Sequence, residues 1–218
     1  MAAADDLQIA IRGKQTHGAQ PWNGVDPIVV AAQVVSGLQT IVSRQEDITK
    51  GPVIITIGKI VGGVRFNIIP DEVQMSGNIR TLDEAVRADV HERVRRTATQ
   101  IAAASGASAT VSIGSEVAYP VTYNDPRLTA RMLPTLQRVV EAGKLIETPP
   151  KTVSEDFAFF QQQIPGLFVF LGVRKPGAGR EEYADNHSPR FRVDEAGLQL
   201  GVRVLANLAV DYLEGGER

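Results

Sequence analysis

Three histidines are the side chains of this chain best suited to acid–base or metal chemistry, because the chain has no cysteine. His17 lies in a glycine-containing polar loop between a predicted strand and a predicted helix, which leaves its imidazole accessible. His187 follows a predicted buried strand and a long polar loop, where α/β proteins commonly build ligand sites. His91 lies beside Glu92 and Arg93 in a charged helical segment, and we interpret it as a solvated residue.

Metal chemistry needs more ligands than these histidines provide. A catalytic zinc site has at least three protein ligands, and the sequence contains neither a His-x-Asp pair nor a His-Glu-x-x-His motif. The acidic pair Glu181–Glu182 fits a solvated loop at least as well as a ligand pair, since arginines lie nearby. The lack of cysteine excludes disulfides and thiolate metal sites, and it is compatible with a reducing compartment. From the residues alone, a loop histidine such as His17 is more often structural than catalytic.

The first half of the chain alternates between strand and helix patterns. Leu7, Ile9 and Ile11 alternate with polar or small residues, which predicts a strand with one buried face. Asp26 and Asp83 are suited to cap two helices, whose apolar residues recur at helical spacing. Further strand patterns lie at residues 53–60, 73–80 and 109–113. The resulting order, βαββαβ, predicts a ferredoxin-like domain of the α+β class, which we place at residues 4–117.

Residues 118–218 have a different pattern. They contain helical segments on either side of one nearly continuous apolar run, Leu167–Val173, which suits a strand that is buried on both faces. A parallel sheet needs several such strands. We therefore expect residues 118–218 to be an incomplete α/β segment whose other strands lie elsewhere.

Four segments together resemble one family of enzymes. They follow the family's order and cover nearly the whole chain: residues 11–21 with 24–28, residues 38–44, residues 62–71 with 77–81, and residues 154–158 with 165–166, 171–172 and 187–191. The family is that of the aminoacylase/carboxypeptidase dimetal hydrolases, in the branch of hippurate hydrolases, N-acyl-amino-acid amidohydrolases and auxin-conjugate hydrolases. The resemblance implies that residues 4–117 are a dimerising lid domain and that residues 118–218 are the C-terminal part of the catalytic domain.

The resemblance implies a role for five residues. His17 matches the lid histidine that reaches the partner subunit's active site and hydrogen-bonds the carbonyl oxygen as negative charge develops. Asn67 matches the lid asparagine that helps to hold the substrate there. Arg80 matches the arginine that binds the substrate carboxylate, for which a planar guanidinium is well suited. Glu155 falls in a motif that lines the active site, and His187 matches a metal-ligating histidine.

Two departures from the family's pattern limit what this chain is expected to do alone. Trp22 stands where many relatives have a second histidine, so contacts with the substrate are expected to differ there. The family's N-terminal region, which supplies the other metal ligands and the general base, is absent from the sequence. The resemblance implies two divalent metal ions in the complete enzyme (zinc, manganese, cobalt or nickel), whereas one imidazole cannot hold two metals. We therefore expect this chain by itself to bind no metal tightly and to be inactive.

The resemblance favours a portion of a metal-dependent amidohydrolase, which cleaves the amide bond of small N-acyl-amino acids with metal-activated water. An alternative is a stand-alone dimerisation or interaction module that kept the lid and lost catalysis. A third interpretation, an RNA-binding βαββαβ module, would need aromatic residues on the central strands, and residues 7–12 and 73–80 have none. The net charge of -2 gives no reason to expect nucleic acid or an anionic membrane as a partner.

We expect the lid to form a homodimer through the helix at residues 27–43 and the strand at residues 53–60. The second strand of a ferredoxin-like order lies at a sheet edge, and this one carries a single charge, Lys59, so little discourages its pairing with another edge. In the helix, Val29, Val30 and Val34 fall outside the stripe that its own sheet should cover, which indicates a second contact.

The composition predicts a cytoplasmic protein that does not enter a membrane. Hydrophobic residues make up 43% of the chain and charged residues 22%, close to the values of soluble globular proteins. No apolar run approaches the roughly 20 residues of a membrane helix. The first residues lack the basic and apolar regions of a signal peptide.

Overall fold

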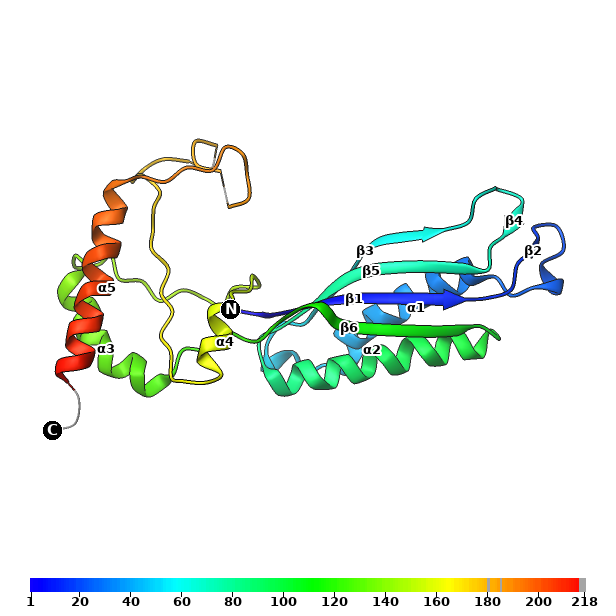
Figure 1. Cartoon of the computed structure of the whole chain (residues 1–218), viewed down its shortest axis with the longest axis horizontal. Helices are drawn as coiled ribbons and strands as arrows, with labels where there is room; N and C mark the ends of the chain where they lie inside the picture. Colours follow the sequence, from blue (N-terminus) through cyan, green and yellow to red (C-terminus); the bar gives the residue numbers. More distant parts are fainter. Residues whose placement is uncertain (180, 185, 216–218) are drawn as a thin grey trace. The chain divides into compact units, whose positions relative to one another are not determined.

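The structure is a computed structural model that describes residues 1–179, 181–184 and 186–215. The chain forms two compact units, which are described separately (Figure 1). The first, named here the lid unit, comprises Met1–Thr122 and Pro150–Gln162. The second, named the C-terminal unit, comprises Tyr123–Pro149 and Gln163–Arg218.

A four-stranded antiparallel sheet is the framework of the lid unit. Its strands are β1 (Ala3–Arg12), β3 (Ile54–Gly62), β5 (Glu72–Thr81) and β6 (Ser108–Tyr119), in the spatial order β3-β5-β1-β6. All three pairings are antiparallel. This is the strand order of a ferredoxin-like fold, so the fold predicted for this part of the chain is confirmed. The strand predicted at residues 53–60 corresponds to β3, which lies at an edge of the sheet as expected.

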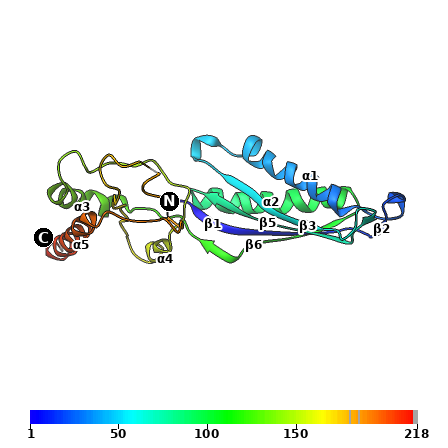
Figure 2. The same ribbon diagram turned by 90° about the horizontal axis from the view of Figure 1, so that it is seen from above.

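Two helices cover one face of this sheet, α1 (Pro27–Thr40) and α2 (Glu84–Ala104) (Figure 2). Each begins at the aspartate predicted to cap it. The Asp26 carboxylate accepts hydrogen bonds from the first backbone N–H groups of α1, and the Asp83 carboxylate does the same for α2. The caps satisfy N–H groups that have no partner inside the helix, and they fix where each helix starts.

Alternate residues of the strands form the core with the inner faces of both helices. The fully buried members include Leu7, Ile9, Ile11, Val73, Ile79, Val90 and Val94. Val30 and Val34 are 2% and 0% exposed and also belong to this core, so the expectation that they form a second contact surface is wrong. The physical reason is that α1 packs against α2 as well as against the sheet, which widens its buried stripe. Val29, which is 54% exposed, remains free for another contact.

The helical run Pro27–Gln45 is long and apolar enough to cross a membrane by length and composition alone. It consists of α1 and the π-helical turn η2 (Ile41–Gln45). No such run was expected from the sequence. Four apolar residues of this run are buried in the lid core: Val30, Val34, Leu38 and Ile41. Packing within the unit therefore explains why the run is apolar. The cytoplasmic location stays a prediction.

A small ribbon lies beyond one end of the sheet. It pairs β2 (Thr16–His17) with β4 (Ile68–Ile69), and a single turn of 3-10 helix, η1 (Pro21–Asn23), follows β2 (Figure 1). The sequence pattern predicted only a loop for residues 13–23. The ribbon gives this loop a defined backbone, because each of its strands has a hydrogen-bonded neighbour.

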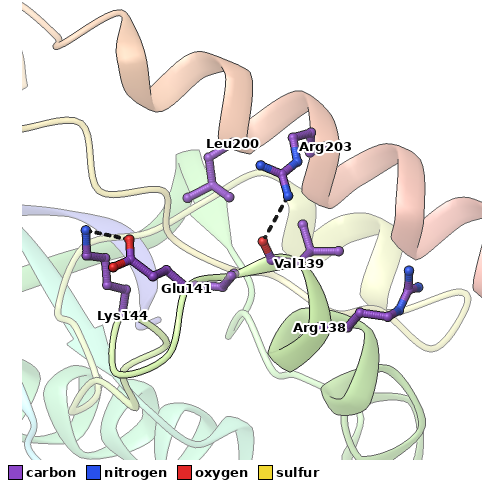
Figure 3. A pocket seen from close by; sticks show the side chains of 7 residues that line it. Arg138, Val139, Glu141, Lys144, Leu200 and Arg203 are labelled. Carbon is purple, nitrogen blue, oxygen red and sulfur yellow. Dashed lines mark hydrogen bonds and ion pairs between the residues drawn. The ribbon is translucent and has the colours of Figure 1, made fainter.

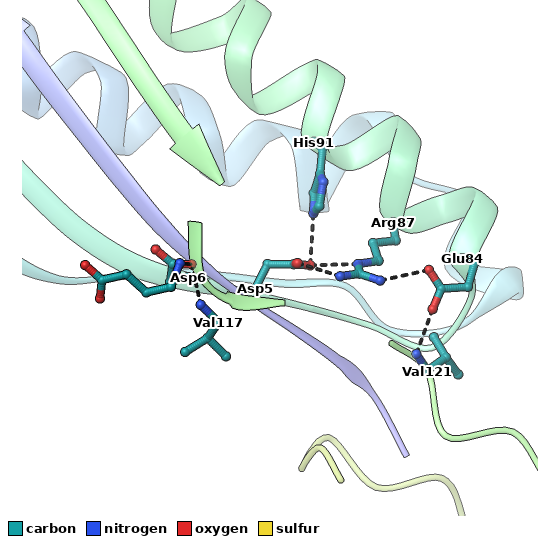
Figure 4. Close-up of polar contacts among 8 residues, drawn as sticks. Asp5, Asp6, Glu84, Arg87, His91, Val117 and Val121 are labelled. Carbon is teal, nitrogen blue, oxygen red and sulfur yellow. Dashed lines mark hydrogen bonds and ion pairs between the residues drawn. The ribbon is translucent and has the colours of Figure 1, made fainter. Parts of the chain in front are cut away.

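A buried cluster of charges joins β1 to α2 (Figure 4). Asp5 occupies a core-facing position of β1, and its carboxylate oxygens lie 2.7 and 2.9 Å from the guanidinium nitrogens of Arg87. His91 Nε2 lies 3.0 Å from the same carboxylate, and the His91 side chain is only 17% exposed. The interpretation of His91 as a solvated residue is therefore wrong. Arg87 and His91 are four residues apart and share one helix face, which α2 turns toward Asp5.

The C-terminal unit consists mainly of two packed helices and long connecting segments. They are α3 (Pro126–Val139) and α5 (Ala196–Glu214), and both were predicted. Leu136, Val139 and Val204 form their small buried contact. The short helix α4 (Phe157–Gln161) belongs to the lid unit.

The apolar run Leu167–Val173 is not a strand in this structure, so that prediction is wrong for the chain as described. Phe170 is 54% exposed, where a strand buried on both faces was expected. A strand needs a neighbour to accept and donate its backbone hydrogen bonds. Here the side-chain amide of Asn124 takes that place at one residue, since it accepts from Phe168 N at 2.7 Å and donates to Phe168 O at 2.8 Å.

Candidate functional site

The ribbon brings together two of the residues that were predicted to act on substrate. His17 is the last residue of β2, and Gly18 N donates to the Asn67 carbonyl oxygen at 2.8 Å. A Cβ at Gly18 would lie only 3.0 Å from that oxygen, so this close approach of two backbones favours glycine. The side chains of His17 and Asn67 are both exposed. These two polar groups therefore form a solvent-facing pair, named here the ribbon pair.

A backbone contact sets the hydrogen-bonding direction of His17. Ala19 N donates to His17 Nδ1 at 3.0 Å. In a neutral imidazole, the nitrogen that accepts a hydrogen bond carries no proton, so the proton resides on Nε2. His17 can therefore present Nε2–H as a donor, which suits a carbonyl oxygen that gains negative charge.

Asp71 anchors the base of the ribbon. Its carbonyl oxygen accepts from Gly13 N at 2.8 Å, and its carboxylate accepts from Gln15 N at 2.9 Å. Lys14 and Val25 exchange two backbone hydrogen bonds, which close the loop that carries His17. These contacts hold the ribbon pair on a structured support and limit the rearrangement that a ligand would require.

A second pair of predicted residues lies elsewhere in the lid unit. Arg80 is on β5, next to the fully buried Ile79, and so projects from the sheet face opposite the helices. Its Nη1 donates to Ser154 Oγ at 3.2 Å. Ser154 directly precedes Glu155, and the segment is held to the start of β1 by hydrogen bonds from Ala2 N to the carbonyl oxygens of Lys151 and Val153. The structure therefore brings Arg80 to the Ser154–Glu155 motif.

Within the described part of the chain, the Arg80 guanidinium makes this single hydrogen bond. A guanidinium has five N–H donors in a planar fork, so most of its capacity is left for a ligand. Arg80 and Glu155 are both half-buried. A partly desolvated, fork-shaped cation of this kind is well suited to bind a carboxylate through two hydrogen bonds.

The ribbon pair and Arg80 lie at opposite ends of the sheet. Strand β5 begins at Glu72, directly after the ribbon's anchor Asp71, and reaches Arg80 eight residues later. At about 3.3 Å per residue, these positions are separated by about 26 Å. Figure 1 shows β2 and β4 at one end of β1 and β5, and the N-terminus at the other. One small substrate cannot contact His17 and Arg80 of the same lid unit.

His187 belongs to the C-terminal unit, where it is exposed and has a backbone φ of 68°. Among the residues that the structure describes, no group of three or more histidine, cysteine, aspartate or glutamate side chains could hold a metal ion. The described residues therefore do not fit a dimetal centre. His187 by itself supplies one possible ligand and no more.

The C-terminal unit also contains a cavity of about 340 Å³ (Figure 3). Its lining residues are Arg138, Val139, Val140, Glu141, Lys144, Leu200 and Arg203. Lys144 and Glu141 form an ion pair at 2.9 Å across its rim. None of the five predicted site residues lines the cavity, so it is distinct from both pairs described above.

The residues that support the site were not predicted from the sequence. Ala19 acts through its backbone N–H, which leaves no side-chain signal. No role was assigned to Asp71, and nothing in its spacing linked it to residues 13–15. Ser154 was named only within the segment 154–158 of the resemblance, whereas in the structure it accepts a hydrogen bond from Arg80.

Comparisons with known proteins agree with this architecture. A family model described as "Peptidase dimerisation domain" matches residues 4–105. Thermostable carboxypeptidase 2 of Saccharolobus solfataricus is 37% identical over 212 residues, which are 97% of this chain and 52% of that protein. N-acetyl-L-cysteine deacetylase of Bacillus subtilis is 37% identical over 217 residues, which are 100% of this chain and 49% of that protein.

A solved structure shows the same fold with detectable sequence similarity. It is a dinuclear metal-binding peptidase of the M20 family from Bacillus subtilis, with a TM-score of 0.76 and 31% identity. The match covers 98% of this chain and 51% of that one. The chain thus spans about half the length of the curated relatives it matches. Residues 4–105 of the lid unit match a peptidase dimerisation domain, and along its whole length the chain is similar to about half of each of these relatives, one of which is a peptidase of the M20 family.

Proposed function

We propose that this chain is the dimerising and substrate-binding portion of a metal-dependent amidohydrolase that cleaves small N-acyl-amino acids. The observation that carries the proposal is the arrangement of two polar pairs at opposite ends of one sheet, the ribbon pair and Arg80 with Ser154. The names of two relatives, a carboxypeptidase and an N-acetyl-L-cysteine deacetylase, are consistent with amide hydrolysis next to an amino acid.

The separation of the two pairs supports an active site shared between subunits. If His17 and Arg80 contact the same substrate, they must come from different copies of the chain, because about 26 Å of β5 separates them within one copy. A two-fold symmetric dimer would create two such sites, each with the ribbon pair of one subunit and Arg80 of the other. This proposal gives the dimerisation domain a direct part in catalysis.

The lid unit offers a surface for this dimer beside edge strand β3. Ile60 and Val61 of β3 are 55% and 53% exposed, and Ile28 and Val29 at the start of α1 are 47% and 54% exposed. The Ile28 side chain lies next to the end of β3, since a Cβ at Gly63 would be 3.8 Å from Ile28 Cδ1. An apolar patch that adjoins an unpaired strand edge suits pairing with a second copy.

The opposite edge is less suited to pairing. β6 carries Ser108, Thr110 and Ser112 along its length. A polar edge discourages association. The homodimer is therefore proposed to form through α1 and β3, with Val29 in place of the buried valines Val30 and Val34.

The roles of the individual residues follow from their chemistry. His17 Nε2–H would donate to the oxygen of the scissile carbonyl and stabilise the negative charge that develops on it. Asn67 would hold the same part of the substrate through its amide. Arg80 would bind the carboxylate of the amino acid, with Ser154 fixing one nitrogen of the guanidinium. Glu155 is proposed to line this end of the site.

Most ligands of the proposed metal ions would come from a region of the relatives to which this chain has no match. We propose two divalent ions in the complete enzyme, with His187 as one ligand and the others from the region that precedes this chain in its relatives. The described residues form no metal centre. The chain alone is therefore proposed to be inactive, because it lacks the groups that would activate water and move its proton.

The second candidate function is a dimerisation module without catalysis. The observation that favours it is the match of residues 4–105 to a dimerisation domain, together with the lack of a metal cluster among the described residues. It gives no role to the fixed tautomer of His17 or to the free donors of Arg80. Both features are consistent with a retained active site.

The test compares the chain alone with a complete protein that also contains the region supplied by its relatives' other half. We expect the chain to hydrolyse no N-acetyl-amino acid, even with added zinc, cobalt, manganese or nickel. The complete protein should hydrolyse such substrates and lose activity when a chelator is added. Chelator-sensitive turnover by the chain alone would contradict the proposal, and a complete, dimeric and metal-loaded protein without turnover would favour the dimerisation module.

A further inference from the structure

Two large aromatic side chains lie exposed beside the ribbon pair. Trp22 is 75% exposed and Phe66 is 104% exposed. Single exposed apolar residues are ordinary on protein surfaces. Here, however, two rings occur on neighbouring segments of one small structure, next to the residues proposed to bind the scissile amide.

Backbone hydrogen bonds hold both aromatic residues close to the ribbon pair. Gln20 N donates to His17 O at 2.8 Å, and Asn23 N donates to Gln20 O at 3.1 Å, so η1 with Trp22 follows directly on the His17 turn. In the turn before β4, Phe66 immediately precedes Asn67, whose carbonyl oxygen accepts from Gly18 N. Trp22 therefore follows His17 closely along the chain, and Phe66 directly precedes Asn67, so each member of the ribbon pair has an aromatic residue close to it in sequence.

The lid unit itself does not cover these rings. Elsewhere in the unit, Tyr119 and Phe159 form an aromatic contact with ring centroids 5.7 Å apart. Within the described residues, Trp22 and Phe66 take part in no such contact, and most of the apolar surface of both rings faces water. Burial of this surface against a ligand would be favourable.

The proposed function indicates which part of a ligand would meet them. If His17 donates to the carbonyl oxygen of the scissile amide, the acyl substituent lies on one side of that carbonyl and the amino acid on the other. The amino acid is the part that Arg80 of the other subunit would bind through its carboxylate. The substrate atoms left for the ribbon are therefore those of the acyl group.

We propose, on the basis of this proposed function, that Trp22 and Phe66 bind the acyl group and select N-acyl-amino acids with an apolar, aromatic acyl substituent. Flat aromatic rings offer a large contact area and favour other rings in stacked or edge-to-face packing. A substituent as small as acetyl would leave most of this area uncovered. Trp22 and Phe66 are thus specificity-determining residues of the amide hydrolysis.

The activity test uses the complete dimeric protein and two substrates that share one amino acid, an N-acetyl and an N-phenylacetyl derivative. Wild type should show the higher kcat/KM with the phenylacetyl substrate. Trp22→Ala and Phe66→Ala should each reduce the ratio of the two kcat/KM values by about tenfold, the usual scale for loss of one good apolar contact. Trp22→Phe should retain most of the ratio.

The matched control is Ile48→Ala, which removes another exposed apolar side chain of the lid unit, 82% exposed and outside the ribbon. Its ratio should equal that of wild type. If wild type hydrolyses neither substrate, the proposed function fails. If wild type is active and the ratio is unchanged in both alanine variants, the acyl-group inference is overturned while the function stands.

Fluorescence of this chain distinguishes substrate from protein as the occupant of the ribbon, because Trp22 is its single tryptophan. Across the concentration range in which sedimentation shows the dimer forming, Trp22 emission and acrylamide quenching should stay those of a solvent-exposed indole. Emission that shifts to shorter wavelength, with quenching lost as the dimer forms, would show that the second copy covers Trp22 and would overturn the inference.

Discussion

The lid unit and the C-terminal unit differ in how much of their apolar surface they bury within themselves. The lid core contains fully buried residues from three strands and two helices. Among the described residues, α3 and α5 of the C-terminal unit bury four apolar side chains at 5–8% exposure, Met132, Leu136, Val139 and Val204. By contrast, Val202, Leu205 and Leu213 on α5 are 68–77% exposed. Both units have apolar periodicity, so periodicity alone does not show whether the packing partner lies in the same chain.

This contrast fits a chain that holds one complete domain and part of another. A helix that is apolar on more than one side is usually buried on more than one side. α5 carries a second apolar face, and Leu167–Val173 has the composition of a central strand without neighbouring strands. We propose that the C-terminal unit completes its core against the region of the relatives to which this chain has no match.

The largest effect expected from a single substitution is in the lid core. Val34→Asp places a charge at a position that is 0% exposed, and it should destabilise the lid by about 4 kcal/mol or more, enough to prevent folding. Val202 on α5 is 69% exposed. Val202→Asp should therefore change the free energy of unfolding by less than about 0.5 kcal/mol in this chain. Urea unfolding followed by circular dichroism measures both. Equal losses would show that the two units are equally packed.

The buried charge cluster of the lid should be the next most sensitive feature. Arg87→Leu leaves the carboxylate of Asp5, whose side chain is 1% exposed, without its main partner, and it should cost about 3 kcal/mol. Arg12→Leu is the matched control, since it removes an ion pair with Glu72 in which Arg12 is 73% exposed, and it should cost less than about 1 kcal/mol. A small loss for Arg87→Leu in urea unfolding would mean that Asp5 is not held by this pair.

Acid should weaken the lid through the same cluster. Burial alone would raise the pKa of Asp5, but hydrogen bonds from His91 and Arg87, and their charges, lower it below its ordinary value of 3.8. The unfolded chain therefore takes up a proton on Asp5 at higher pH than the folded chain. The stabilisation is complete above pH of about 5 and is lost as the pH falls below about 4.

Asp5→Asn removes this dependence and gives the measurement. The urea midpoint of the variant should be lower than that of wild type at neutral pH, and it should fall less between pH 5 and pH 3. Some slope should remain, because backbone N–H groups of Val117 and Glu116 lower the pKa of Asp6 against the effect of its burial. An equally steep fall in the variant would rule out Asp5 as a source of the acid sensitivity.

The dimer surface should respond without any loss of lid stability. Val29→Glu and Val61→Glu alter side chains that are 54% and 53% exposed, so the lid should stay folded but become monomeric in sedimentation velocity. Val117→Glu on edge strand β6, 40% exposed, should remain dimeric. Folded dimers of the first two variants would mean that the chain associates through another surface.

The lid fold could be predicted from the sequence because its packing partners lie within one stretch of chain. Alternation from Leu7 onward and the caps Asp26 and Asp83 were sufficient for the order of strands and helices. Extending the β1 alternation back to Asp5 would have placed a carboxylate in the core, and a buried partner for it could then have been sought on α2. His91 was misinterpreted because its partner is 86 residues away.

Other features depend on contacts that no local pattern contains. Val30 and Val34 were assigned to the surface because helix periodicity does not show that α1 packs on α2 as well as on the sheet. The pairing of Gly18 with Asn67 joins two short strands far apart in sequence, and only the family resemblance linked His17 to Asn67. The resemblance also named Arg80, whereas its hydrogen bond to Ser154 required the structure.

Subunit mixing tests most directly the central claim, that the ribbon pair of one subunit acts with Arg80 of the other. His17→Ala and Arg80→Ala are prepared separately in the complete protein, and each homodimer should be nearly inactive. In a heterodimer of the two, one site has both residues intact and the other has neither. Random exchange should therefore restore about a quarter of the wild-type activity, from one intact site in each heterodimer. If heterodimers form and no activity returns, His17 and Arg80 do not act across the dimer and the account is wrong.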